Sequence, residues 1–205
     1  MARAAGAGAY RKAQEAGQAA LRTAVLDAAS GLLGSEGAAA LSMRRVAGSV
    51  GASTKVLYTM FGSKEGLVEA LCEEGFARFE GALRAAVRSA DPRTRLVELG
   101  HAYRDYALSE PHYYQVMFGA RAVSGRRTDP GTHRSHITFD FPVRAVRAAM
   151  EAGVLKPGDP QQVAETLWAA LHGLVSLELA GHLDPDNGAR RLEAMLSALS
   201  GDLLA

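Results

Sequence analysis

Basic side chains and uncharged hydrogen-bond donors are concentrated between Leu41 and Lys64, a stretch that contains no Asp or Glu. A surface that binds phosphate groups needs cations and neutral donors, whereas carboxylates would repel the phosphates. The residue types therefore predict contacts with a nucleic acid, against the alternative of a solvated helical hairpin that happens to carry arginine. The candidate DNA-binding residues are Ser42, Arg44, Arg45, Ser53, Thr54, Lys55, Tyr58, Thr59 and Lys64.

Two short helices joined by a glycine turn would position these side chains. Ser42 precedes the first helix and Ser53 or Thr54 the second, where a hydroxyl can accept a hydrogen bond from a free backbone N–H. Gly51 lies at the point where a chain leaving a helix often adopts a positive φ angle. This is the helix-turn-helix pattern, whose second helix enters the major groove of DNA. The residues expected to face inward on the second helix are Val56, Leu57 and Met60.

Position along the two helices suggests a role for most of the candidates. Thr54 and Lys55 begin the second helix and are predicted to contact base edges, with Arg44 reaching in from the first helix. Lys64 lies at the start of the following helix, where free backbone N–H groups also attract anions. The residues expected to contact phosphates are Ser42, Tyr58, Thr59 and Lys64.

Residues 21–83 resemble the DNA-binding domain of the TetR family of bacterial one-component repressors. Met60 departs from the pattern, because relatives often carry a His or an aromatic ring there, so one backbone contact of the family is not expected in this chain. The matching residues are Ala28, Ala29, Gly37, Val46, Ala47, Gly51, Ala52, Ser53, Leu57, Tyr58, Phe61, Ser63, Lys64, Glu65 and Leu67.

A second, shorter resemblance lies in the C-terminal half, where Trp168, His172 and Gly173 are similar to the Trp…His-Gly signature of one subgroup of the family. Together the two resemblances imply a homodimeric repressor that binds a near-palindromic operator and is released by a small-molecule effector. They also imply dimerisation through the last two helices and an effector site walled by these three residues.

The rest of the chain predicts an all-α protein of about nine helices. Its expected parts are a flexible arm over residues 1–17, a helix-turn-helix DNA-binding domain over 18–66, and a ligand-binding and dimerisation domain over 67–205. Helices are predicted over residues 18–35, 63–89, 133–152, 160–182 and 185–203, with a surface loop over 120–131.

Aromatic and polar-tipped side chains recur along the predicted helices of the second domain. A small-molecule site in a helical bundle needs an apolar pocket with a few placed polar groups. The alternative is ordinary core packing, which is the commoner use of aromatic residues at helical spacing. The candidate ligand-binding residues are His101, Tyr103, Tyr106, Tyr114, Met117, Phe118, Phe139, Trp168 and His172.

Composition bears on the charge distribution of the chain and on its cellular compartment. The chain has 205 residues and a net charge of only +1, but residues 1–64 hold eight Lys or Arg against three Asp or Glu, so positive charge is concentrated around the motif. No apolar run reaches the roughly 20 residues of a membrane span. The N-terminus does not have the pattern of a signal peptide, and the single cysteine, Cys72, fits a reducing cytoplasm.

No sequence motif indicates catalysis, a cofactor or a metal. His133 and His136 have helical spacing, but neither a second pair nor a cysteine cluster completes a zinc pattern. We therefore expect no enzyme. Two alternatives to a ligand-responsive repressor stay open: a helical small-molecule-binding protein that does not read DNA, and a constitutive DNA-binding protein without an effector.

Overall fold

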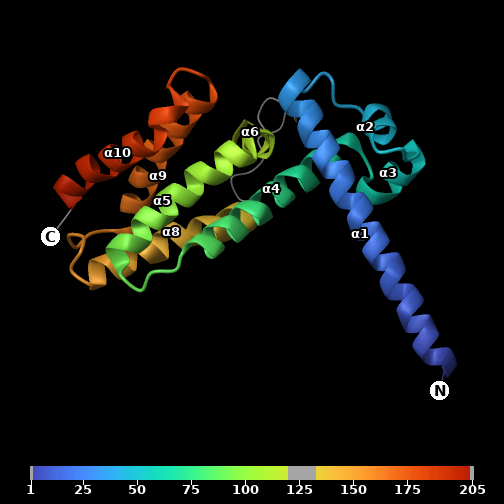
Figure 1. Cartoon of the computed structure of the whole chain (residues 1–205), viewed down its shortest axis with the longest axis horizontal. Coiled ribbons are helices and arrows are strands. Elements are labelled where there is room, and N and C mark those ends of the chain that lie inside the picture. The colour runs from blue at the N-terminus through green and yellow to red at the C-terminus, as the bar shows by residue number, and fades with distance from the viewer. Residues whose placement is uncertain (1, 120–132, 204–205) are drawn as a thin grey trace. The chain divides into compact units, whose positions relative to one another are not determined.

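The computed structural model describes residues 2–119 and 133–203, and all regular structure among them is helical (Figure 1). Nine α-helices and one short 3-10 turn lie in these residues, which confirms the all-α prediction. The predicted loop over 120–131 lies outside the described residues. The chain forms two compact units, and the boundaries between them lie within α4 and within α6. Unit 1 contains the described residues 2–74 and 115–119, and unit 2 contains 75–114 and 133–203.

Unit 1 is built on the long helix α1 (Ala2–Glu36), with α2 (Met43–Ser49) and α3 (Thr54–Phe61) beside its C-terminal part (Figure 1). The first part of α4 (Lys64–Ala86) completes it. These helices close on aliphatic side chains that recur at helical spacing. The most deeply buried of these are Val25, Leu26, Ala29, Leu41, Val46, Leu57, Leu67 and Leu71.

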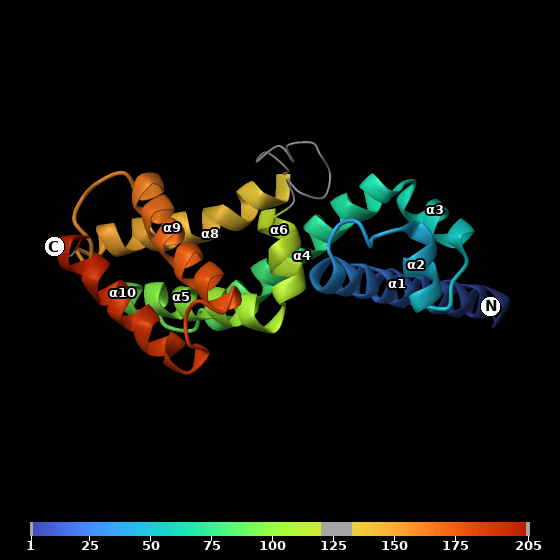
Figure 2. The same cartoon turned by 90° about the horizontal axis from the view of Figure 1, so that it is seen from above.

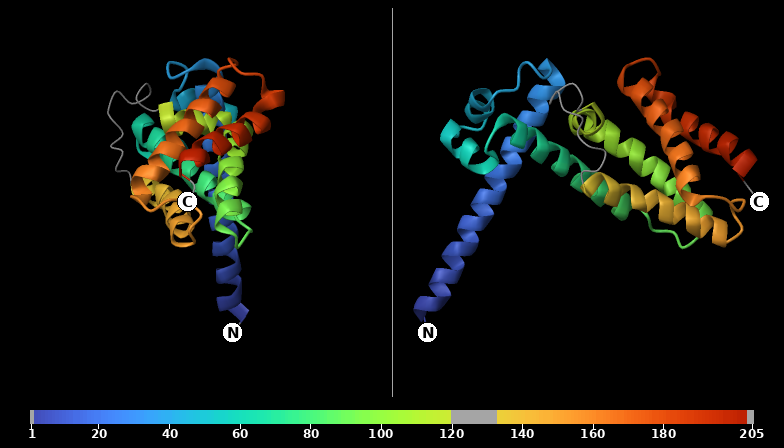
Figure 3. Two further views of the ribbon diagram at one scale, coloured as in Figure 1. Left: turned by 90° about the vertical axis from the view of Figure 1, so that its left-hand side faces the viewer. Right: turned by 180° about the vertical axis from the view of Figure 1, so that it is seen from behind.

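Helix α1 begins at Ala2, so its predicted start at Gln18 was wrong. Residues 2–17, expected as a separate arm, continue the helix, and no other element of unit 1 lies beside this part of α1 (Figure 3). Side chains 10–20 are all exposed. The reason is local: alanine, the best helix former, dominates this segment and supports helix without tertiary contacts. The mobility expected for residues 1–17 stays a prediction.

Unit 2 is a helical bundle formed by α5 (Pro92–Ser109), α8 (His133–Glu151), α9 (Pro160–Leu179) and α10 (Gly188–Leu203), joined by the end of α4 and the start of α6 (Pro111–Gly119). Figure 2 shows α9 lying between α8 and α10. Helix α5 contacts α8, α9 and α10 in turn. One aliphatic cluster between α8 and α9 contains Val143, Val146, Ala149, Leu155 and Ala164.

Helix starts in unit 2 follow the sequence closely. Asp91 caps α5 by accepting from the Thr94 N–H (2.8 Å), and Asp159 caps α9, each followed by proline in the first turn. The last predicted helix is divided: a 3-10 turn over Pro185–Asn187 precedes α10.

A buried ion pair that no sequence pattern indicated fixes the start of α10. Arg104 on α5 donates to both carboxylate oxygens of Glu178 on α9, with Nε 2.9 Å from Oε2, and its Nη2 reaches the Pro185 carbonyl at 3.4 Å. Gly188 begins α10 directly against this pair, and a Cβ atom there would overlap both side chains. Glycine at this position therefore lets three helices meet around one buried charge pair.

Candidate nucleic-acid interface and aromatic cluster

The helix-turn-helix forms as the sequence predicts. The Ser42 hydroxyl accepts from the Arg45 N–H at 3.3 Å, and the Ser53 hydroxyl accepts from the Val56 N–H at 3.4 Å, so both serines cap their helices. Gly51 has a φ angle of 66°, which glycine adopts without the steric cost of a side chain. Each serine uses its oxygen as an acceptor in the cap, so its O–H can still donate to a phosphate.

Helix α3 presents a mixed surface to solvent. Thr54, Lys55 and Thr59 are exposed, as is Tyr58 at 53% of its surface. Leu57 and Phe61 pack inward. The expectation that Val56 also faces inward was wrong, because 37% of its surface is exposed. Helix α3 has only eight residues, about two turns, so it can bury only one narrow stripe.

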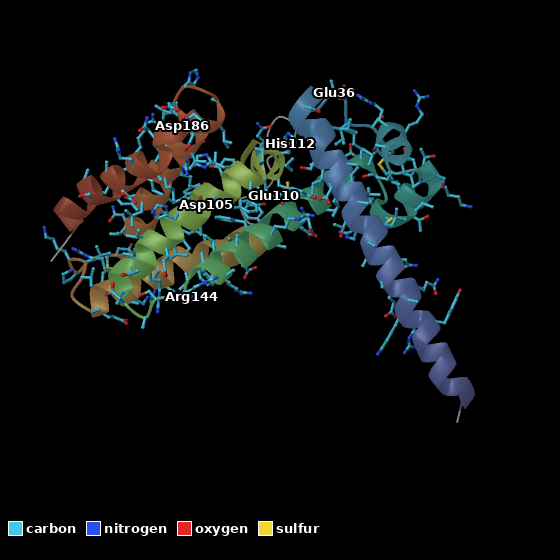
Figure 4. The ribbon with its side chains drawn as sticks, in the orientation of Figure 1. Glu36, Asp105, Glu110, His112, Arg144 and Asp186 are labelled. Atoms are coloured by element: carbon cyan, nitrogen blue, oxygen red, sulfur yellow. The ribbon has the colours of Figure 1, made fainter. Side chains whose placement is uncertain are left out.

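Arg44 and Arg45 are neighbours in sequence but have different surroundings. Arg44 is exposed. Arg45 forms a two-pronged ion pair with Glu36, with N–O distances of 2.7 and 3.0 Å. Glu36 lies at the C-terminal end of α1, where the chain turns toward α2 (Figure 4). The hydrogen bonds from Arg45 lower the pKa of the Glu36 carboxyl.

Lys64 also has a partner within unit 1. Its ammonium group donates to the Ala38 carbonyl at 3.3 Å, and the side chain is half-buried. Arg45 reaches the Ala40 carbonyl in the same loop at 3.4 Å. Two of the four predicted DNA-binding cations therefore hold the loop between α1 and α2, whose carbonyl groups have no helix to satisfy them.

The polar centre of unit 2 is a triangle of three side chains from α5, α6 and α9. The hydroxyls of Tyr103 and Tyr114 lie 3.0 Å apart, and the His172 Nδ1 atom is 2.9 Å from the first and 2.7 Å from the second. Three polar atoms at mutual hydrogen-bond distance, two from the consecutive helices α5 and α6 and one from the distant α9, are the placed polar groups expected of a small-molecule site.

Aromatic rings continue from this triangle in both directions. Phe79 on α4 contacts Tyr103 edge-on, with ring centroids 5.3 Å apart, and contacts Tyr106 at 5.1 Å. On the other side, His172 contacts Trp168 at 5.5 Å, and Trp168 contacts Phe139 on α8 at 5.7 Å. We call these seven residues the aromatic cluster: Phe79, Tyr103, Tyr106, Tyr114, Phe139, Trp168 and His172.

Burial keeps the three titratable side chains Tyr103, Tyr114 and His172 uncharged. It raises the pKa of Tyr103 and of Tyr114, because the phenolate form loses its hydration. It lowers the pKa of His172 for the same reason, since the imidazolium form is the charged one. These three side chains are therefore neutral near pH 7, and the aromatic cluster favours neutral groups over charged ones.

The structure brings together only part of the predicted ligand-binding set. Met117 and Phe118 belong to unit 1, beyond the point where α6 divides. His101 faces α10, with its Nε2 atom 3.9 Å from a Glu193 carboxylate oxygen. Gly173, expected in the wall of the site, is exposed, and no atom of the described chain would contact a Cβ placed on it. Sequence reasoning missed Phe79, whose only signal was its place on the apolar stripe of α4.

Other kinds of site find little support in the described part of the chain. No group of three or more His, Cys, Asp or Glu residues within it has a metal-binding arrangement, and the side chains of His133 and His136 lie outside the described set. None of the described helices combines the length and apolar character of a bilayer span. Burial raises the pKa of Cys72 to about 11, so this thiol is a poor nucleophile.

Two family models match this chain. Residues 25–71 match the model of bacterial regulatory proteins of the tetR family, and residues 96–199 match the tetracyclin repressor-like C-terminal domain. The chain therefore belongs to the TetR family of transcriptional regulators, with an N-terminal helix-turn-helix DNA-binding domain and a C-terminal ligand-binding domain.

Solved structures agree with this membership. A protein of unknown function from Rhodococcus sp. RHA1 is 29% identical, with a TM-score of 0.79 over 90% of this chain and 96% of its own. A structure concerned with control of antibiotic production by bacterial hormones is 26% identical, with a TM-score of 0.71 over 90% and 97%. The TetR family regulator PfmR from Thermus thermophilus shares the fold at 20% identity, with a TM-score of 0.69 over 86% and 97%. No curated protein matches the sequence.

Proposed function

We propose that this protein is a homodimeric, effector-responsive repressor that binds a near-palindromic operator. The observation that carries this proposal is the surface of α2 and α3, which presents exposed Arg44, Thr54, Lys55 and Tyr58 in a stretch without an acidic residue. Two copies of α3 would lie in successive major grooves, so the symmetry of the operator would follow the symmetry of the dimer. In this proposal the protein acts in the cytoplasm as a DNA-binding regulator and catalyses no reaction.

Individual contacts follow from the exposure of each side chain. Thr54 and Lys55 at the start of α3 contact base edges, and Arg44 reaches the DNA from α2. Arg45 and Lys64 contribute to phosphate binding only if they exchange their present partners, Glu36 and the Ala38 carbonyl, for the DNA. The side chains that donate to phosphates are Ser42, Ser53 and Tyr58, whereas the Thr59 hydroxyl already donates to the Lys55 carbonyl.

The aromatic cluster is the effector site in this proposal. A neutral cluster of rings around two phenols and an imidazole suits an uncharged effector with a flat ring and a hydrogen-bonding group. The 26% identical structure concerned with bacterial hormones supports a small signal molecule as the kind of effector. Helix α4 contributes residues to the cores of both units, so an effector that prefers one position of α4 would change the spacing of the two α3 helices.

Dimerisation is proposed through α9 and α10. Ala169, Gly173 and Leu177 are exposed on α9 at a spacing of four residues, which places them on one face of the helix. Leu177 leaves 47% of its surface exposed. An apolar stripe with a glycine at its centre allows a partner helix to approach closely, so these two helices and their symmetry mates would form a four-helix bundle.

The first experiment is selection of operator DNA from a random library with the purified full chain. A two-fold symmetric motif is the expected result, and Arg44→Ala combined with Lys55→Ala in one chain should abolish its binding. A double variant that keeps tight specific binding would contradict the site assignment. If a folded dimer enriches no motif, the protein is instead a small-molecule-binding protein that does not read DNA.

The effector is tested separately, by the thermal midpoint of the protein across a panel of metabolites and antibiotics. A ligand of the folded state raises the midpoint, and an effector also releases the selected operator. Trp168 is the chain's single tryptophan, so its fluorescence gives a second readout from within the aromatic cluster. A protein that binds its operator but responds to no ligand by either readout would be a constitutive DNA-binding protein.

A further inference from the structure

Val56 is an apolar side chain exposed where the proposed reading helix meets DNA. It leaves 37% of its surface to solvent, although the sequence predicted it to be buried. Leu57 and Phe61 form the inward stripe of α3, and Val56 lies beside this stripe with part of its surface covered and part open to solvent. Exposed large hydrophobic residues are few among the described residues: Tyr10, Val56, Tyr58, Val97 and Leu177.

Helical geometry places Val56 on the outward surface with two neighbours. At about 100° per residue, Lys55, Thr59 and Val56 fall within an arc of about 100°, away from Leu57 and Phe61. Lys55 and Thr59 are both exposed. The arc therefore combines one flexible cation with two β-branched side chains, whose preferred rotamers are few.

Thr59 adds to the apolar character of this arc. Its hydroxyl donates to the Lys55 carbonyl one turn earlier, at 2.9 Å. That hydrogen bond occupies the proton of the hydroxyl within the helix, so the methyl group is the other substituent that Thr59 offers to a partner. Beside the Lys55 ammonium group, the outward surface of α3 thus carries the methyl groups of Val56 and Thr59.

Thymine is the base that matches such a surface. In the major groove it presents a methyl group beside its O4 acceptor, whereas adenine, guanine and cytosine present hydrogen-bonding groups and no methyl group. Placing Val56 against a polar base edge would leave that edge without a partner, while contact with a methyl group removes apolar surface of both from water. We propose that Val56 contacts the 5-methyl group of one thymine in each operator half-site and selects thymine there.

This inference rests on the proposed function, because it needs an operator. The test uses the full-length wild-type protein and its selected operator, with each symmetric pair of thymines replaced in turn by 2′-deoxyuridine, which lacks only the methyl group. Fluorescence anisotropy gives the dissociation constant of each duplex. We expect one pair to weaken binding by about fourfold per half-site, the effect of one methyl group removed from an apolar contact.

Variants assign the lost contact to its side chain. Val56→Ala should bind the selected operator more weakly and should be insensitive to deoxyuridine at the sensitive pair. Val97→Ala is the matched control, since Val97 on α5 has the same residue type and the same exposure of 37%, and it should behave as wild type. Thr59→Ser removes only a methyl group and keeps the hydroxyl that bonds to the Lys55 carbonyl, and it should keep the sensitivity to deoxyuridine.

Three results would overturn the inference. One is an operator in which no thymine pair is sensitive to deoxyuridine. Another is a sensitive pair that stays sensitive in Val56→Ala, and the third is a sensitivity that disappears in Thr59→Ser alone, which would assign the methyl contact to Thr59. Failure of the wild-type protein to select any operator is a different result, since it overturns the proposed function and this inference together.

Discussion

Each unit of the molecule contains an arginine that donates two hydrogen bonds to one carboxylate. The two ion pairs differ in how far they are buried. In unit 1, Arg45 and Glu36 form their pair near the surface of α2, with 44% and 48% of the side chains exposed. In unit 2, Arg104 and Glu178 form theirs in the interior, with 11% and 1% exposed. Both pairs join a guanidinium to a carboxylate, so their different exposure to solvent must account for any difference in their roles.

Solvent decides whether such a pair can change partners. Water and salt screen an exposed pair, which contributes little to stability and can exchange its carboxylate for a phosphate. A buried pair has lost its hydration on folding, so removing one partner leaves a poorly compensated charge. For Arg104, a long contact with the exposed Asp105 carboxylate, 4.0 Å from Nη1, would remain. The comparison therefore predicts that unit 2 uses its arginine to hold helices together, while unit 1 keeps its arginine available for binding.

Breaking the buried pair should give the largest effect. Glu178→Gln leaves the Arg104 guanidinium without its carboxylate, and we expect a loss of about 3–5 kcal/mol in the free energy of unfolding. Denaturant unfolding of the variant and the wild type measures this loss. Replacement of both residues by methionine should restore much of the stability, because no buried charge remains. Equal losses in the single and double variants would show that helix packing, not charge, sets the effect.

The next largest effect concerns unit 1 and its binding of DNA. Lys55 is exposed and needs to release no carboxylate among the described residues, so Lys55→Ala should weaken operator binding by about 1–3 kcal/mol. Anisotropy titrations at one fixed salt concentration measure this change. Glu69→Gln, an exposed position on α4, is a control that leaves the reading surface intact. If Lys55→Ala binds as wild type, the affinity comes from the other candidate cations, Arg44, Arg45 and Lys64.

A smaller effect is expected in the pH dependence of the free energy of unfolding. It concerns the neutral aromatic cluster, as a contrast to the two charged pairs. Burial lowers the pKa of His172 in the folded state, so below its ordinary value of about 6.5 the unfolded state binds more protons. The stability that His172 contributes is therefore complete above about pH 6.5 and decreases as the pH falls toward the lowered pKa. The groups around it, Tyr103, Tyr114 and Trp168, carry no charge in this range.

Unfolding measured at about pH 7.5 and about pH 5.5, on either side of the ordinary histidine pKa, checks the direction. The wild type should lose more stability between these values than His172→Gln, which has no proton to gain. His182→Gln is the matched control, since His182 is exposed just beyond the end of α9 and should leave the loss unchanged. A wild type and a His172→Gln variant with the same pH dependence would show that the imidazole is solvated in the folded state.

The elements with local causes could be predicted from the sequence. Ser42, Ser53 and Asp91 cap helices where their side chains reach the next turn, and Gly51 turns the chain between α2 and α3. The residues of the proposed reading surface could be listed as a set because they lie within one short stretch. These features need only neighbouring residues, so they can be inferred from spacing alone.

The features that were missed or wrongly predicted depend on contacts that the spacing of residues along the chain does not reveal. Glu36 lies outside the acid-free stretch, so its pairing with Arg45 required knowledge of how α1 ends. Glu178 is 74 residues from Arg104 along the chain, and only the packed bundle brings them together. Val56 looked buried because apolar residues at helical spacing usually are, and α3 is too short for two buried stripes. Long-range pairing and the width of a buried face both depend on tertiary structure.

The smallest effect decides whether the comparison between the two ion pairs holds. If phosphate displaces Glu36, Arg45→Ala should make the negative slope of log affinity against log salt less steep, by about 0.9 for each subunit, because one phosphate contact is lost. Glu36→Gln should raise operator affinity slightly without changing that slope, since it removes only the competing carboxylate. Titrations between about 50 and 200 mM salt, the range over which such slopes are resolved, measure both variants. An Arg45→Ala variant with the wild-type slope would mean that the exposed pair persists on DNA, and Arg45 would then hold the loop before α2 as Arg104 holds the start of α10.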